Sequence, residues 1–219
     1  GSGLERIAAA KLGDSDVFKI SLMWPIVEKL QELSGKTYEN HTESMRVIAD
    51  HLRAATFLAV DGCVPSNKEQ GYVMRRLLRR AIRYSFDLGI EQNFLEEIVP
   101  VIAGLYASDF PEVADNRKTI IAVLVKEEKA FRQTLRKGIA QMQKFASDGL
   151  TGAELFMLYD TYGFPVELAV EEATKQGVVL PEDWREQFDA KMQEQRERSQ
   201  TAAKGTFKGG LGGKTMAHR

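Results

Sequence analysis

Hydrophobic positions recur at intervals of three and four residues along most of this chain, which is the spacing of one face of an α-helix. The segment Met45–Ala59 follows this pattern, and Thr42 is a suitable N-cap before it. A second helix is predicted from about Gly71 to Leu88, with Gly89 as its C′ residue. The longest predicted helix runs from about Asn116 to Ser147.

Shorter helical segments complete the pattern. Asn93–Ala107 is predicted to be a helix that is interrupted near Pro100, because proline has no backbone N–H to donate. Thr151 opens a short helix, Pro165 begins another, and Pro181 introduces the last one.

Strand signals are almost absent from the sequence. No stretch sustains a two-residue alternation, and Val178–Leu180 is the only strand candidate. The sequence therefore predicts an all-α fold, a multi-helix domain with long amphipathic helices. From Thr201 onward, glycine and lysine dominate, which is typical of a flexible tail.

Composition narrows the class of protein. The 219 residues are 43% hydrophobic with a net charge of −1, and no run reaches the roughly 18 apolar residues of a membrane span. The start lacks the pattern of a secretory signal. Cys63 is the only cysteine, and the three histidines show no metal-ligand spacing, so no disulfide and no metal are expected. We expect a cytoplasmic protein without a membrane partner.

Positive charge is concentrated between Ser66 and Asp87, where six cations face two acids, a local balance of +4. The arginines are predicted to lie opposite the apolar stripe of their helix and to form one broad, solvent-facing surface. A phosphate backbone would relieve their mutual repulsion. Alternatively, they pair with acids of other helices or are simply hydrated. The six cations are Lys68, Arg75, Arg76, Arg79, Arg80 and Arg83.

Two polar residues allow a structural or a functional interpretation. Ser66 or Asn67 can cap the cationic helix, but an exposed Asn67 can also recognise the edge of a base, since its amide both donates and accepts. Asp160, in the aromatic segment Leu158–Pro165, can cap the helix near Pro165 or hold the turn. It can also accept a hydrogen bond from an amino group, such as that of guanine in a minor groove.

Catalytic signals are few. The chain has no glycine-rich phosphate loop, serine nucleophile elbow or metal motif. Cys63 is predicted to be a small hydrophobic residue, and His51 to be a structural group. No catalytic residue is therefore predicted, and the chain alone is not expected to be an enzyme.

Four segments together resemble the alanyl-tRNA synthetase family. They are Met45–Ala54, Pro65–Asn67, Gly71–Arg83 and Leu158–Pro165, and their order and separation match the family from Gly3 to about Ser199. Gly3–Arg6 resembles the end of the third class II motif, whose arginine contacts ATP. The resemblance thus implies that Arg6 is an ATP ligand of the parent enzyme.

The resemblance also implies a domain organisation. Residues 1–13 would be the end of the catalytic domain, 14–200 a helical domain that binds the acceptor stem of alanine tRNA, and 201–219 a linker towards an editing domain. ATP with Mg and zinc are expected only in the other domains of the parent, which would be partners of this one. Because the first two class II motifs are missing, no aminoacylation is expected here. We also expect no ATP binding, because Arg6 alone forms no pocket.

Within that family, the G·U wobble pair at the third position of the acceptor stem is the identity element. The resemblance implies that Asn67 and Asp160 recognise this pair, while Lys68 and the five arginines hold phosphates. A rival hypothesis is a helical spacer that orients the catalytic and editing domains. It predicts that the Arg75–Arg83 face is buried against protein.

Overall fold

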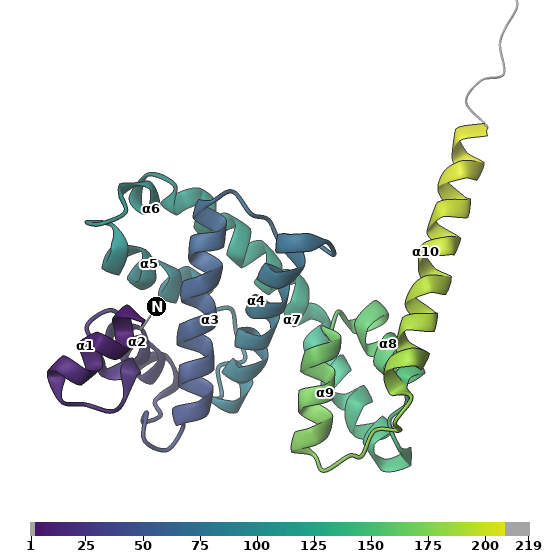
Figure 1. Ribbon diagram of the computed structural model, residues 1–219, viewed down its shortest axis with the longest axis horizontal. Coiled ribbons are helices and arrows are strands. Elements are labelled where there is room, and N and C mark those ends of the chain that lie inside the picture. Colours follow the sequence, from purple (N-terminus) through teal and green to yellow (C-terminus); the bar gives the residue numbers. More distant parts are fainter. Residues whose placement is uncertain (1–2, 209–219) are drawn as a thin grey trace, which may run out of the picture. The chain divides into compact units, whose positions relative to one another are not determined.

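The computed structural model describes residues 3–208, which form ten α-helices and one 3-10 helix (Figure 1). No strand occurs in this part of the chain, so the all-α prediction is confirmed, and Val178–Leu180 is irregular. No described helix is both long and apolar enough to cross a membrane. The elements are α1 (Leu4–Leu12), η1 (Val17–Lys19), α2 (Trp24–Ser34), α3 (Thr42–Val60), α4 (Glu69–Asp87), α5 (Leu95–Tyr106), α6 (Pro111–Asp115), α7 (Arg117–Asp148), α8 (Gly152–Tyr162), α9 (Val166–Lys175) and α10 (Trp184–Lys208).

The chain divides into two packed units. Unit 1 comprises Gly1–Lys137, and unit 2 comprises Gly138–Arg219. The long helix α7 contributes its first part to unit 1 and its last turns to unit 2. The boundaries predicted from the sequence at residues 13 and 200 separate regions by their expected function, not by their packing, and they stay a prediction.

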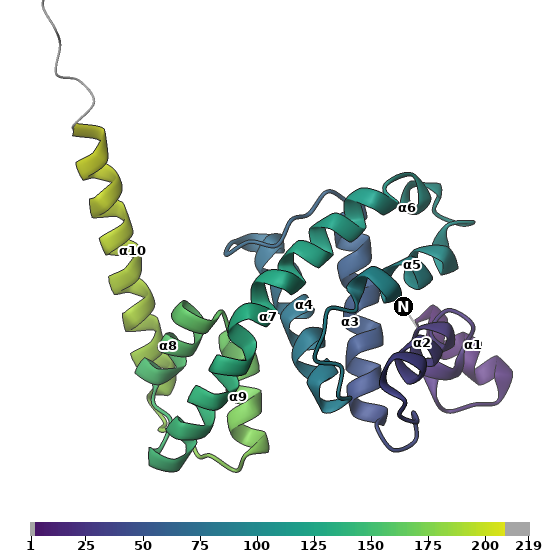
Figure 2. The same ribbon diagram turned by 180° about the vertical axis from the view of Figure 1, so that it is seen from behind.

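The core of unit 1 is centred on α3 and α4, which lie side by side in both views (Figure 1, Figure 2). The apolar stripes that the sequence predicts face inward: Ile48 and Leu52 of α3 and Met74 and Leu78 of α4 are fully buried. Burying such side chains is the main favourable term in folding, at about 1.5–3 kcal/mol each. The buried stripes therefore decide which faces of α3 and α4 remain available for contact with solvent, other helices or a partner.

A buried carboxylate attaches α7 to the start of α5. Glu128 is fully buried, and its two oxygens accept the backbone N–H groups of Phe94 and Leu95 at 3.0 and 3.1 Å. A negative charge at a helix N-terminus is favourable, because the first N–H groups of a helix have no partner within it. Arg132, one turn along α7, balances the charge through an ion pair of 3.0 Å.

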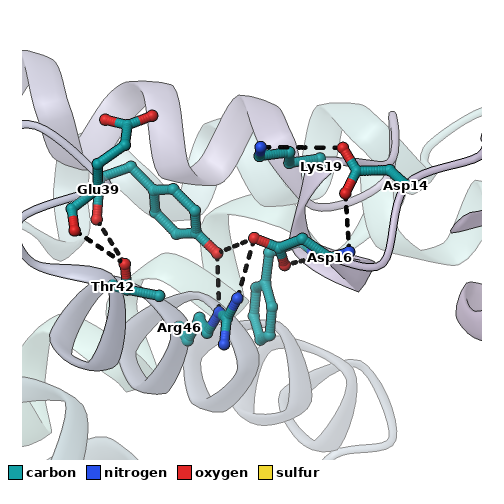
Figure 3. Close-up of polar contacts among 8 residues, drawn as sticks. Asp14, Asp16, Lys19, Glu39, Thr42 and Arg46 are labelled. Atoms are coloured by element: carbon teal, nitrogen blue, oxygen red, sulfur yellow. Dashed lines mark hydrogen bonds and ion pairs between the residues drawn. The ribbon is translucent and has the colours of Figure 1, made fainter.

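A second polar cluster ties the segment before η1 to α3, and Figure 3 shows its Asp16 and Arg46. Tyr38 Oη donates to Asp16 Oδ2 at 2.6 Å, and Arg46 Nε donates to Tyr38 Oη at 2.8 Å. Burial raises the pKa of Tyr38 to about 12, and its hydrogen bond to Asp16 acts in the same direction. Burial opposes ionisation of Asp16, but the hydrogen bonds from Tyr38, Phe18 N–H and Arg46 outweigh it and lower the pKa of Asp16.

Unit 2 is built on α8, which packs against both α9 and α10. Thr151 is the N-cap of α8, and with Glu154 it forms a capping box, as the helix start predicted at Thr151 requires. Gly138 of α7 allows the close approach of Phe164, because a Cβ at this position would lie 2.3 Å from the Phe164 ring. The turn between α8 and α9 therefore packs directly against the α7 backbone.

Three local predictions are wrong. α3 begins at Thr42 with His41 as its N-cap, and the Thr42 hydroxyl donates to Tyr38 O instead of capping. α5 continues through Pro100, since burial of Ile98 and Ile102 on either side outweighs one missing hydrogen bond. α10 extends to Lys208, so residues 201–208 are helical. The rest of the predicted tail lies outside the described residues.

The Asp16 cluster predicts a pH-dependent contribution to stability. Asp16→Asn should lower the free energy of unfolding at pH 7 by about 1–3 kcal/mol, because it removes a charged acceptor from a partly buried network. The folded-state pKa of Asp16 is depressed, so its contribution is complete above the ordinary value of 3.8 and is lost as pH falls through the folded pKa.

Urea unfolding of both proteins between pH 7 and pH 3 would measure this difference. It should shrink towards the acid end, whereas the same change at the exposed Asp109 should have little effect throughout. A difference for Asp16→Asn that stays constant with pH would contradict this account.

Candidate functional site

The arginines of α4 are largely engaged with protein groups. The side chain of Arg79 is only 13% exposed, and it contacts Glu127 of α7 through Nη2 at 2.6 Å and Nε at 2.7 Å. Arg75 lies 3.2 Å from the same carboxylate, and Arg83 is paired with Asp87 at 2.8 Å. One acid from another helix thus serves two of the five arginines.

His51 and Arg80 form another contact between α3 and α4. Arg80 Nη1 lies 2.8 Å from His51 Nε2, and His51 Nδ1 lies 3.1 Å from Asp50 Oδ2. Because a guanidinium only donates, Nε2 must accept and Nδ1 must carry the proton. The hydrogen bond from His51 lowers the pKa of Asp50. Both ring nitrogens of His51 are therefore engaged with neighbouring side chains, and a purely structural role stays a prediction.

The broad solvent-facing arginine surface predicted from the sequence is wrong. All five arginines are half-buried, including Arg76. Periodicity places them opposite the apolar stripe, but it does not show that α7 packs beside that face and brings Glu127 with it. Arg75 and Arg79 pair with an acid of another helix, as the alternative predicted, whereas Arg83 pairs with Asp87 of its own helix. Whether these arginines also hold phosphates stays a prediction.

Asn67 lies exposed on the loop before α4, and its side chain does not cap the helix. The N-cap of α4 is Lys68, also exposed, and the helix has no side-chain cap. The Oδ1 atom of Asn67 instead accepts a hydrogen bond from Arg75 Nη1. Gly71 lets the loop lie directly on the helix: a Cβ there would be 2.1 Å from Ser66 Oγ and 2.6 Å from Val64 O. Because Gly71 has no side chain, the loop that carries Asn67 can lie against the first turn of α4.

An open hollow of about 720 Å³ lies beside this loop, between α4 and α7 of unit 1. Pro65 of the loop is one of its lining residues. The lining also contains one acid, Glu127, and four cations: Arg75, Arg79, Lys118 and Lys126. Lys118 and Lys126 are exposed, and no ion pair of either is found within residues 3–208. The net positive lining suits an anionic partner.

Asp160 lies in unit 2, near the end of α8, and is exposed. It does not cap the next helix, since the N-cap of α9 is Pro165, and the turn is held by backbone hydrogen bonds such as Phe164 N–H to Leu158 O at 3.0 Å. Its Oδ1 atom accepts a hydrogen bond from Gln195 of α10. Both structural interpretations of Asp160 are therefore wrong, and its carboxylate is displayed on the surface.

Arg6 lines a second hollow in unit 1, of about 460 Å³, so the expectation that it has no pocket is wrong. Glu5, Asp50 and Arg53 share the lining, and Arg53 is paired with Glu5 at 2.9 Å. Two carboxylates thus offset two guanidiniums, which does not favour a triphosphate. The expectation that this chain alone does not bind ATP stays a prediction.

Residues 1–213 match the family of class II (A) tRNA synthetases. The chain belongs to this family. An alanine–tRNA ligase of Halalkalibacterium halodurans is 41% identical to this chain over 212 residues, which cover 92% of the chain and 24% of that ligase. Alanine–tRNA ligases of Streptococcus pyogenes serotype M3 and Streptococcus agalactiae serotype V are each 39% identical over 226 residues, which cover 99% of the chain and 26% of each ligase.

The resemblance to the alanyl-tRNA synthetase family is thereby confirmed. The chain spans about a quarter of the length of these relatives. Sequence reasoning missed Lys118 and Lys126 as candidate binding residues. The available signal was their spacing of eight residues, which places both on one face of α7 about two turns apart.

The position of the Asn67 loop should depend on Gly71. Gly71→Ala should destabilise the protein by about 1–3 kcal/mol or displace the loop, because the new methyl group would overlap Ser66 and the backbone of Val64. Gly104→Ala in α5 is a matched control: nothing lies within 4 Å of its Cβ, so it should stabilise the helix by up to about 1 kcal/mol.

Thermal unfolding followed by circular dichroism would compare the two variants. Equal melting temperatures for Gly71→Ala and Gly104→Ala would show that the loop does not press on α4.

Proposed function

We propose that this chain binds the acceptor stem of alanine tRNA and recognises its G·U pair, as part of an alanine–tRNA ligase. One observation carries the proposal. Asn67 and Asp160, the residues implied to recognise the pair, are both exposed, although local sequence favoured capping for Asn67 and a cap or turn role for Asp160. Asn67 lies on the loop before α4 and Asp160 near the end of α8, and their exposure leaves both accessible to a base edge.

The chemistry of a wobble pair suits these two groups. In a G·U pair, the amino group of guanine projects into the minor groove without its usual cytosine partner, and an A-form minor groove is wide and shallow. The Asp160 carboxylate only accepts, so it selects an amino group there. Asn67 belongs to unit 1 and Asp160 to unit 2, so the proposal requires the stem to contact both units.

Affinity requires cations that can face the backbone. The two exposed lysines beside the hollow, Lys118 and Lys126, are better placed for phosphate contacts than Arg79, which already serves Glu127. Phosphate contacts supply grip and orientation, whereas base contacts supply selectivity. In this proposal the lysines of α7 supply affinity through phosphate contacts, and Asn67 and Asp160 supply selectivity through base contacts.

A second candidate function is a helical spacer between the catalytic and editing domains. The half-buried, paired state of Arg75 and Arg79 favours it, because that hypothesis requires the arginine face to contact protein. It leaves the exposure of Asn67 and Asp160 without a role. A gel shift at low salt with an acceptor-stem minihelix separates the two functions, since a spacer would not retard the RNA.

Base recognition predicts that the chain prefers a G·U minihelix to a G·C minihelix. Asp160→Ala should remove about 1–3 kcal/mol of this preference, since it deletes one good base contact. Glu186→Ala, which removes an equally exposed carboxylate from α10, should leave the preference unchanged. Equilibrium binding to both RNAs would measure it, and equal affinity of the unaltered chain for the two stems would refute base recognition.

If the lysines beside the hollow contact phosphates, the affinity for RNA should depend on salt concentration through them. The double change Lys118→Ala, Lys126→Ala should weaken the binding of both minihelices alike. It should also reduce the slope of log K against log salt by about 1.5, because two phosphate contacts are lost. Lys11→Ala, at an exposed lysine of α1, should leave the slope as it is. An unchanged slope in the double variant would remove Lys118 and Lys126 from the interface.

A further inference from the structure

Arg75 of α4 joins the Asn67 loop to α7. Arg75 Nη1 donates to Asn67 Oδ1, and Nη2 lies 3.5 Å from the carbonyl oxygen of Pro65 in the same loop. Its Nε atom is 3.2 Å from Glu127 of α7. The side chain is 22% exposed, so most of it is covered by these neighbours.

This contact decides what Asn67 can offer to a partner. An asparagine amide usually presents both an acceptor oxygen and a donor NH₂ group, and either end can face a neighbour. A guanidinium has donors only, so the atom that faces Arg75 must be the oxygen. The NH₂ group does not take part in this contact, and because Asn67 is exposed, it is the donor that the side chain offers to a partner.

We propose that Arg75 is a positioning residue that fixes the orientation of the Asn67 amide, and thereby sets which base edge this chain accepts. The inference rests on the proposed function and deepens it. A fixed NH₂ donor favours an acceptor in the groove, such as a base carbonyl, a ring nitrogen or a ribose oxygen. An exocyclic amino group at the same point would meet another donor and would be rejected.

The competing role for Arg75 is a phosphate contact, which was the expectation from the sequence. Nη1 and Nη2 of Arg75 already donate to Asn67 and Pro65, whereas Nε lies near Glu127 without a hydrogen bond, so binding a phosphate through Nη1 and Nη2 would require giving up the contacts with the loop. Lys118 lines the same hollow without such contacts within the described part of the chain. Arg75 and Lys118 can therefore be compared directly: the first is proposed to orient Asn67 and the second to bind a phosphate.

The test measures the affinities of G·U and G·C minihelices for Arg75→Met, Asn67→Ala and the double variant. Arg75→Met keeps the length of the side chain and removes every donor. Both single variants should lower the G·U preference by about fivefold to tenfold, and the double variant should lower it no further, because both changes interrupt one contact. Lys118→Ala should weaken both RNAs equally and leave the preference intact.

Asn67→Asp adds an isosteric probe. It retains an oxygen for Arg75 but replaces the outer NH₂ group with a second acceptor, so it should lose at least as much preference as Asn67→Ala. In the unbound chain, NMR of the Asn67 side-chain amide should show an ordered group that becomes mobile in Arg75→Met. That readout does not depend on RNA.

The outcomes separate the two levels of the argument. If Asn67→Ala leaves the preference unchanged, base recognition by Asn67 fails and this inference fails with it. If Asn67→Ala lowers the preference but Arg75→Met weakens both RNAs alike, or leaves the amide ordered, the positioning role of Arg75 alone is overturned. Coupled loss of preference together with a mobile amide supports the positioning role.

Discussion

The carboxylate of Glu127 is the constraint on which the arrangement of unit 1 around the candidate site depends. It is 9% exposed and holds Arg75 and Arg79 of α4 from α7. A buried acid needs such partners, and the arginines need a counter-charge once α7 covers them. The ion pairs thus set the position of Arg75, Arg75 holds Asn67, and Gly71 lets the loop lie on the helix. The display of one exposed amide follows from this series of contacts.

The helical framework was largely predictable, because amphipathic periodicity and end signals act locally. α7 begins and ends within one residue of the predicted bounds, Thr151 caps α8, and Gly89 follows α4 with a left-handed φ of 76°. Pro100 was misjudged, since the rule on proline ignores tertiary burial of its neighbours. The end of α10 was misjudged from glycine content alone.

The site was less predictable than the fold. Periodicity located the arginines on one face of α4, but whether that face meets water or α7 depends on residues some fifty positions away, such as Glu127. Likewise, local sequence could not distinguish Asn67 as a cap from Asn67 as a surface group, because the deciding contact comes from Arg75. The resemblance to a synthetase family supplied the functional hypothesis. The geometry adds Lys118 and Lys126 of α7, which are exposed beside the hollow, to the residues proposed to contact a phosphate backbone.

Recognition of the wobble pair by a fixed amide is tested most directly by NMR titration of the Asn67 side-chain amide. At matched saturation, its resonances should shift strongly with the G·U minihelix and only weakly with the G·C minihelix, because only the former brings the acceptor and the wobble geometry together. Identical shifts with both RNAs would contradict the account.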